Sequence, residues 1–173
     1  MFYDLLKTRR SIRKFQDKEV EREKLDLILK SALLAPSSRS IRPWEFIVVS
    51  DKELLNKLSK CREHSSQFLS GAKHAIIVIA DAEKSDVCVE DASIASIVIQ
   101  LAAQSQGLGS CWIQVRNRFR NKEESAGNYI KELMHIPEKY CVESIIAIGY
   151  PNENKKPYDE NDSAYDKIHY DSF

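Results

Sequence analysis

Three arginines and a serine lie close together near the start of the chain, in the run Arg9-Arg10-Ser11-Ile12-Arg13. In a helical or turn-like backbone, at least two guanidinium groups and the hydroxyl fall within about one turn. The planar guanidinium matches phosphate oxygens in a bidentate way. The alternative is a solvated basic face near a helix end, stabilised by the helix dipole. Both interpretations stay open for this segment.

A second polar segment, Ala35 to Arg42, follows about 25 residues downstream. It contains two arginines, three serines and a proline between an expected helix and an expected strand. The side chains of a surface loop are not needed to fill the core, so they are free to contact a ligand. Hydroxyls and guanidinium groups suit a phosphate-bearing cofactor with a polyol tail. Alternatively, serine and proline only punctuate the chain here, and Trp44 is a core aromatic residue at the entrance of the strand.

The run Gly107-Leu108-Gly109-Ser110-Cys111-Trp112 lacks both the GxGxxG and the GK[ST] patterns of phosphate loops. We interpret Gly107 as the end of a helix. Gly109 then allows close backbone approach, so that the amides of the next strand can come near a flat ligand.

No nucleophile and base stand in a recognisable spacing. The cysteines show neither CxxC spacing nor a zinc pattern, and they are expected to be reduced, mostly buried thiols. The four histidines are His64, His74, His135 and His169, and the four cysteines are Cys61, Cys88, Cys111 and Cys141. The sequence therefore predicts no catalytic side chain and no metal site, and it favours a cofactor that carries the chemistry.

These segments must be positioned by alternating helices and strands. Apolar spacing predicts helices over 3–8, 21–34, 52–60, 87–105 and 121–134, and strands over 46–49, 75–80, 110–115 and 142–148. In the helix 21–34, one apolar stripe is formed by Leu25, Ile28, Leu29, Ala32 and Leu33. Ser50 and Glu53 fit a capping box for the third helix. The pattern predicts helices packed on a sheet in a single domain over 1–173. Strand order does not follow from it, and the aromatic tail, 152–173, is expected to wrap a surface that could belong to a partner subunit.

The composition is that of a globular protein, with 43% apolar and 30% charged residues. Basic and acidic residues balance at 26 each, so no global field recruits nucleic acid or an anionic membrane. The longest apolar stretch, Ala75 to Ala80, is too short to span a bilayer. With no signal-peptide pattern at Met1 to Asp4, a cytoplasmic location is expected.

Four blocks in this order resemble the nitroreductase family of FMN-dependent oxidoreductases. They are Arg9-Arg10-Ser11-Ile12-Arg13-Lys14-Phe15, Ala35-Pro36-Ser37-Ser38 leading to Pro43-Trp44-Glu45-Phe46, Gly107 to Ile113, and Ile148-Gly149-Tyr150-Pro151. The resemblance implies an α+β fold, a three-layer α-β-α sandwich with a mostly antiparallel central sheet. It also implies an intertwined homodimer with FMN at the subunit interface.

By this resemblance, the first arginine cluster holds the flavin phosphate and the pyrimidine edge of the ring. The loop reaches the ribityl chain and ring from the other subunit, and the strand after Gly109 lies against flavin N5. The implied cofactor-binding residues are Arg9, Arg10, Ser11, Arg13, Pro36, Ser37, Ser38, Arg39, Ser40, Ile113, Gln114, Val115, Lys155 and Lys156.

The implied reaction is ping-pong: NADH or NADPH gives hydride to flavin N5, and a small acceptor such as a nitroaromatic or quinone then takes its place. The family commonly has Asn where this chain has Ser40 and Gln where it has Arg42, so Arg42 could favour an anionic acceptor. Two alternatives stay open. One is a flavin carrier or sensor with little turnover, and the other is an α/β domain whose basic first third docks an acidic partner.

Overall fold

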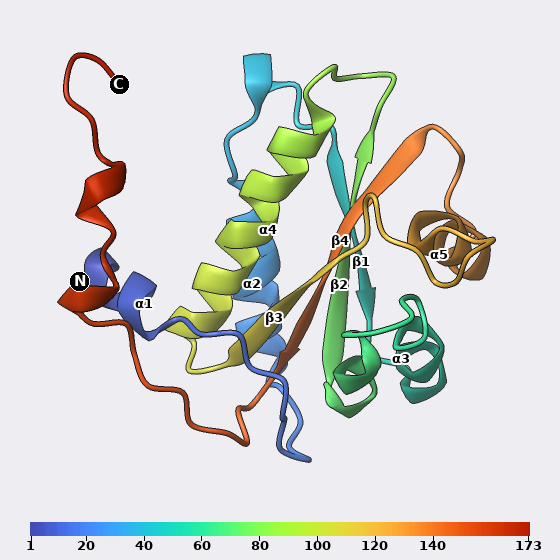
Figure 1. Cartoon of the computed structure of the whole chain (residues 1–173). Helices are drawn as coiled ribbons and strands as arrows, with labels where there is room; N and C mark the ends of the chain where they lie inside the picture. The colour runs from blue at the N-terminus through green and yellow to red at the C-terminus, as the bar shows by residue number, and fades with distance from the viewer.

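The computed structural model describes all 173 residues. Its helices are α1 (Phe2–Thr8), α2 (Arg22–Leu33), α3 (Lys52–Leu58), α4 (Cys88–Ser105) and α5 (Ala126–Met134), and its strands are β1 (Trp44–Val49), β2 (His74–Asp81), β3 (Gly109–Gln114) and β4 (Tyr140–Gly149). The sheet has the order β1-β2-β4-β3, and every neighbouring pair is antiparallel. Helices α2 and α4 cover one face, while α3 and α5 cover the other (Figure 1). The expected α+β, three-layer fold is confirmed.

The two central strands are buried on both faces because successive side chains enter different cores. In β2, Ala75, Ile77 and Ile79 pack toward α3 and α5. Ile76 and Val78 pack with α2 and α4 on the opposite face. This period of two explains why the strand is an unbroken apolar run in the sequence.

Helix α4 is the central packing helix that its apolar sequence predicts. It contacts α2 and strands β2, β3 and β4. Its end is a Schellman motif: Gly107 has φ 72°, the N–H of Leu108 donates to the carbonyl of Ala103, and the N–H of Gly107 donates to that of Gln104. The motif turns the chain directly into β3.

Three local expectations were wrong. The cap of α3 is Asp51, whose carboxylate accepts from the N–H of Leu54 at 2.8 Å, and not Ser50. Helix α5 begins at Ala126 because residues 119–125 form a hairpin closed between Phe119 and Ser125. Leu33 is 51% exposed, although its spacing in α2 predicted burial.

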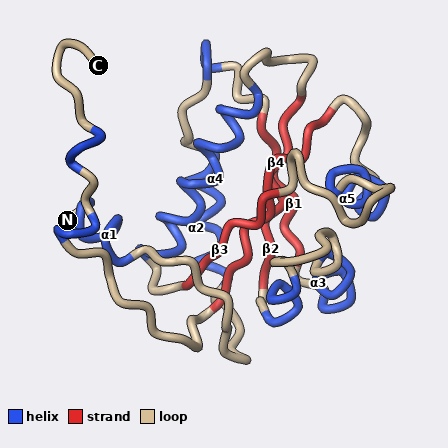
Figure 2. The backbone as a smooth tube through the Cα atoms, in the orientation of Figure 1, coloured by secondary structure: helices blue, strands red, loops and turns tan.

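The segment that follows α1 and most of the C-terminal tail run over the surface as loops (Figure 2). The N-terminal segment 9–15 pairs with β3 through a parallel bridge between Ser11 and Ser110. The tail carries only two short 3-10 turns, and the N–H of Tyr158 donates to the carbonyl of Lys7 at 3.0 Å. None of the helices combines the length and apolar character of a membrane-spanning helix.

Candidate functional site

The basic segment, residues 9–15, crosses the edge of the sheet where two glycines of neighbouring strands face each other. Gly109 of β3 pairs with Gly149 of β4. A Cβ atom on Gly109 would lie 2.9 Å from the side chain of Ile12, and one on Gly149 would lie 2.9 Å from the ring of Phe15. The close approach at Gly109 is therefore made by the chain's own Ile12. This contact fixes the path of the arginines between Ile12 and the end of α1.

Glu153, just beyond β4, holds the middle of the basic segment. One carboxylate oxygen accepts from the backbone N–H groups of Arg13 at 2.5 Å and Lys14 at 3.1 Å. The other oxygen pairs with Lys155 at 3.0 Å. The hydrogen bond from the Arg13 N–H, with the one from Lys155, lowers the pKa of Glu153 to about 2. Glu153 thus stays ionised among the cations and orders them, a role that sequence reasoning missed.

Arg9, Ser11 and Arg13 gather beside Cys111 of β3. Burial raises the pKa of the Cys111 thiol, whereas the charges of Arg13 and Arg9 and the hydroxyl of Ser11 act to lower it. Neither Arg9 nor Arg13 forms an ion pair with any carboxylate of the chain. Two guanidinium groups are therefore free to meet an anion from outside.

The side chains of Arg10 and Lys156 do not join the group beside Cys111. The Arg10 guanidinium stacks 4.3 Å from the ring centroid of Tyr158 and donates to the carbonyl of Lys156. The ammonium group of Lys156 pairs with Asp159 at 3.1 Å. These two predicted residues tie the tail to the basic segment, and only Lys155 of the lysine pair lies with Glu153.

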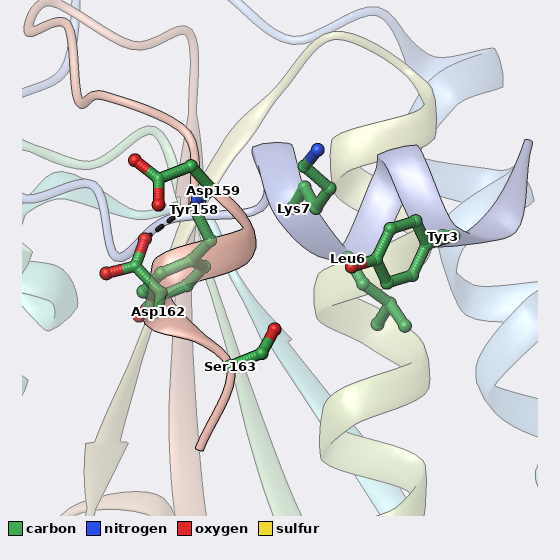
Figure 3. Close-up of a pocket in the computed structure, with 7 residues that line it drawn as sticks. All are labelled: Tyr3, Leu6, Lys7, Tyr158, Asp159, Asp162 and Ser163. Carbon is green, nitrogen blue, oxygen red and sulfur yellow. Dashed lines mark hydrogen bonds between the residues drawn. The ribbon is translucent and has the colours of Figure 1, made fainter. Parts of the chain in front are cut away.

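Two hollows flank this region. One, of about 190 Å³, lies beneath the segment between Arg10, Gln104 and Lys155. The other, of about 260 Å³, lies between α1 and the tail, where Tyr3 and Leu6 face Tyr158 and Asp162 (Figure 3). The first hollow has two cations in its lining, but Arg10 donates to the carbonyl of Lys156 and Lys155 pairs with Glu153, which also lines the hollow. The second has Lys7 as its only cation, against two carboxylates, so it does not suit a phosphate group. The free guanidinium groups of Arg9 and Arg13 line neither hollow.

Strand β3 forms an open edge of the sheet beside the arginines. The carbonyl of Ser110 faces outward, since it accepts from the N–H of Ile12 at 3.0 Å. By the alternation of an antiparallel ladder, the backbone groups of Trp112 and Gln114 face the same way. The side chains of Ile113 and Val115 are buried. Their backbone groups face β4, where the N–H of Val115 donates to the carbonyl of Glu143 at 3.1 Å, so of the three predicted strand residues only Gln114 offers its backbone to a ligand.

The Gln114 side chain is held on every side. Its carbonyl oxygen accepts from Trp112 Nε1 at 2.9 Å, and its amide donates to Glu143 at 3.2 Å and to the carbonyl of Arg116 at 3.1 Å. Glu143 is 3% exposed and pairs with Arg116 at 3.1 Å. Sequence reasoning also missed Glu143, although a glutamate inside the apolar strand was a visible signal.

The loop 35–42 lies at the opposite end of α4 from the basic segment (Figure 1). Its Ser38 N–H donates to Asp91 in the first turn of α4, while Gln104 in the last turn donates to Thr8. An 18-residue helix is about 27 Å long. Within one chain, Pro36, Ser37, Ser38, Arg39 and Ser40 are therefore remote from Arg9, Ser11 and Arg13.

The donors fit a phosphate-bearing, flat cofactor. Two unpaired guanidinium groups, a hydroxyl and a lysine match phosphate oxygens. The outward amides of β3 match the polar edge of a ring. No triad or group of metal ligands competes with this interpretation. His74 of β2 is buried, its Nδ1 has no hydrogen-bond partner, and burial lowers its pKa.

Comparisons with known proteins agree with this geometry. The model of the Nitroreductase family matches residues 6–61 and 59–150. A solved FMN-dependent nitroreductase from Clostridium difficile R20291 is 57% identical, with a TM-score of 0.98 over 99% of both chains. A protein of Archaeoglobus fulgidus, provisionally named NADH dehydrogenase/NAD(P)H nitroreductase, is 40% identical over 95% of this chain and 94% of its own. A similarly named protein of Methanothermobacter thermautotrophicus is 41% identical over 96% of this chain and 84% of its own.

Proposed function

Because the chain belongs to the nitroreductase family, we propose that it is an FMN-dependent oxidoreductase that takes reducing equivalents from NADH or NADPH. The acceptor is a nitroaromatic, a quinone or a related small molecule. The observation that carries the proposal is the pair of unpaired guanidinium groups, Arg9 and Arg13, beside Ser11 and the open edge of β3.

Arg9, Ser11 and Arg13 would bind the phosphate and the pyrimidine edge of FMN, with Lys155, held by Glu153, adding a third positive charge. The backbone N–H of Gln114 would serve the N5 edge of the ring, and the pairing of β3 with β4 on either side of Gln114 keeps that N–H facing outward. When bound, FMN supplies hydride acceptance and donation at N5. The protein supplies orientation and a positive field at the pyrimidine edge.

The ribityl chain and the far side of the ring are served by Pro36, Ser37, Ser38, Arg39 and Ser40 of a second subunit. The separation of this loop from the arginines along α4 supports a shared site. Exposed apolar side chains support the dimer, since large apolar patches on a surface mark interaction sites. They lie on α4, at the N-terminus and along the tail 152–173, which wraps the partner: Phe2, Ile94, Ile97, Tyr165, Tyr170 and Phe173.

The test starts from purified protein. We expect a yellow preparation, or one that takes up FMN on reconstitution, with bound flavin released on unfolding. Anaerobic NADH or NADPH should bleach the flavin absorbance, and a nitroaromatic or quinone should restore it. Protein that cannot be loaded with FMN contradicts the proposal. Bound flavin that neither nucleotide bleaches favours a flavin carrier or sensor instead.

A further inference from the structure

The loop Ala35 to Arg42 holds three residues in the left-handed region of backbone space. Their φ angles are 50° at Arg39, 53° at Ser40 and 52° at Arg42. Residues with a Cβ adopt this conformation rarely and at a cost in free energy. No glycine in the loop relieves that cost. Such a backbone persists only where its surroundings hold it in place.

Two backbone hydrogen bonds close turns inside the loop, from the N–H of Ser40 to the carbonyl of Ser37 at 3.1 Å and from the N–H of Ile41 to that of Ser38 at 3.0 Å. Three contacts that involve side chains are also available to hold it. The N–H of Arg42 donates to Ser37 Oγ at 2.8 Å, which is a contact inside the loop itself. Arg39 pairs with Asp86, but both side chains are exposed, and exposed ion pairs contribute little. The third contact is the 2.8 Å hydrogen bond from the N–H of Ser38 to Asp91 Oδ1. Of the three, it is the one that is partly buried and joins the loop to a helix of the core.

Asp91 occupies an unusual position for a carboxylate. It is 2% exposed and forms no ion pair. Its second oxygen accepts from Ser85 Oγ at 3.2 Å, and it lies in the first turn of α4, where the helix dipole favours a negative charge. These two hydrogen bonds and the helix dipole compensate the burial of the carboxylate. An apolar side chain at this place would leave the N–H of Ser38 without a partner, so Asp91 is placed to hold the tip of the loop.

We infer that Asp91 is a positioning residue of the cofactor site. Its carboxylate holds the N–H of Ser38, and through it the left-handed run 39–42, so that the loop hydroxyls stay aimed at the flavin bound by the other subunit. This inference rests on the proposed function, because it needs the loop to serve a flavin. Apolar packing of Ala35 and Trp44 against Ala95 fixes the two ends of the loop, and Asp91 fixes its tip.

The first experiment measures the Kd for FMN of the apoprotein by quenching of flavin fluorescence. Asp91→Ala should weaken binding about tenfold or more, the size of a lost hydrogen bond to a charged group. Asp91→Asn keeps an acceptor for Ser38, so it should stay within about threefold of wild type. Asp86→Asn is the matched control and should bind FMN like wild type, because it removes only the exposed partner of Arg39. Hydrogen exchange at the Ser38 amide should speed up in Asp91→Ala and not in Asp91→Asn.

A second pair of variants leaves Asp91 in place. Ser37 has φ −141° and ψ 156°, the extended conformation that precedes proline readily, so Ser38→Pro removes the N–H donor with little change in the path of the chain. Ser38→Ala removes only the hydroxyl and serves as its reference. Ser38→Pro should weaken FMN binding about tenfold beyond Ser38→Ala.

Equal affinities in that pair, or wild-type affinity in folded Asp91→Ala, would overturn the inference. Absence of FMN binding by the wild type would instead refute the proposed function.

Discussion

At the scale of single residues, Arg13 tests the assigned phosphate and ring contact most directly. Its side chain is exposed and has no ionic partner, so removing it should leave the fold intact. We predict that Arg13→Ala weakens FMN binding about 10- to 100-fold, because hydrogen bonds to charged groups contribute about 1.5–3 kcal/mol. Titration of the apoprotein with FMN measures this change.

Lys14→Ala is the matched control for Arg13→Ala. The variant removes one positive charge from the neighbouring residue, and the hydrogen bond from the backbone N–H of residue 14 to Glu153 remains. Its affinity for FMN should stay close to wild type. Equal losses in the two variants would show that only the summed charge of the segment matters.

Arg42 is the residue through which the loop can select among acceptors. Arg39 is neutralised by Asp86, whereas the Arg42 guanidinium is exposed and forms no ion pair. We predict that Arg42→Gln raises the KM for 4-nitrobenzoate about two- to fivefold, as expected for an exposed charge pair, and that the effect shrinks with added salt. The KM for neutral 4-nitrobenzyl alcohol should not change. Parallel changes for both acceptors would contradict a role of charge.

At the scale of elements, the glycine pair of β3 and β4 positions the basic segment. Gly109→Ala places a Cβ 2.9 Å from the Ile12 side chain, and overpacking of this kind costs about 1–3 kcal/mol. We predict a Tm lowered by roughly 2–10 °C and weaker FMN binding, because the arginines move with Ile12.

Gly127→Ala is the control for this change. Its Cβ would meet only Ser125 Oγ, at 3.9 Å, and alanine favours a helix, so its Tm should rise or stay unchanged. The double variant Gly109→Ala/Ile12→Ala relieves the clash and should recover part of the lost stability. A Gly109→Ala protein as stable as wild type would contradict this packing.

The link between Glu153 and the basic segment should respond to pH. The pKa of Glu153 is lowered to about 2 in the folded protein, chiefly by the hydrogen bond from the N–H of Arg13. A carboxylate with a lowered folded pKa adds stability above its unfolded pKa, about 4.3, and loses that contribution as the pH falls toward the folded value.

We therefore predict that Glu153→Gln lowers the free energy of unfolding of the apoprotein most above pH 5. The difference from wild type should shrink between pH 4.5 and 2. Urea unfolding across this range measures it, with Glu160→Gln as an exposed control that has no ion pair to lose. A difference independent of pH would contradict the role of the charge.

The sequence predicted the elements better than it predicted their neighbours. Apolar periodicity located every helix and strand, because burial of one or both faces sets that pattern. It could not reveal that residues 9–15 pair with β3 or that Glu153 caps them, since both contacts join distant parts of the chain. The left-handed backbone at Arg39, Ser40 and Arg42 also has no local signal, because no glycine or asparagine occupies these positions.

At the scale of the whole molecule, the dimer decides whether the site is complete. The loop and the arginines lie at opposite ends of α4. If both serve one flavin, as proposed, a monomer presents two half-sites and no whole one. Sizing chromatography of the wild type should show a dimer. A monomer that binds FMN tightly would contradict the shared site.

Mixed dimers give the sharpest test of sharing. Arg13→Ala damages the phosphate half of each site, and Asp91→Ala damages the loop half, so each homodimer should bind FMN poorly. In a mixed dimer, one site combines both defects, while the other combines the intact arginine of one chain with the intact loop of the other. Subunits exchanged by mild denaturation and renaturation, and isolated through two different affinity tags, should therefore bind close to one FMN per dimer with wild-type affinity. If both halves of a site came from the same chain, every site in the mixed dimer would carry one defect, and mixing would restore no tight binding.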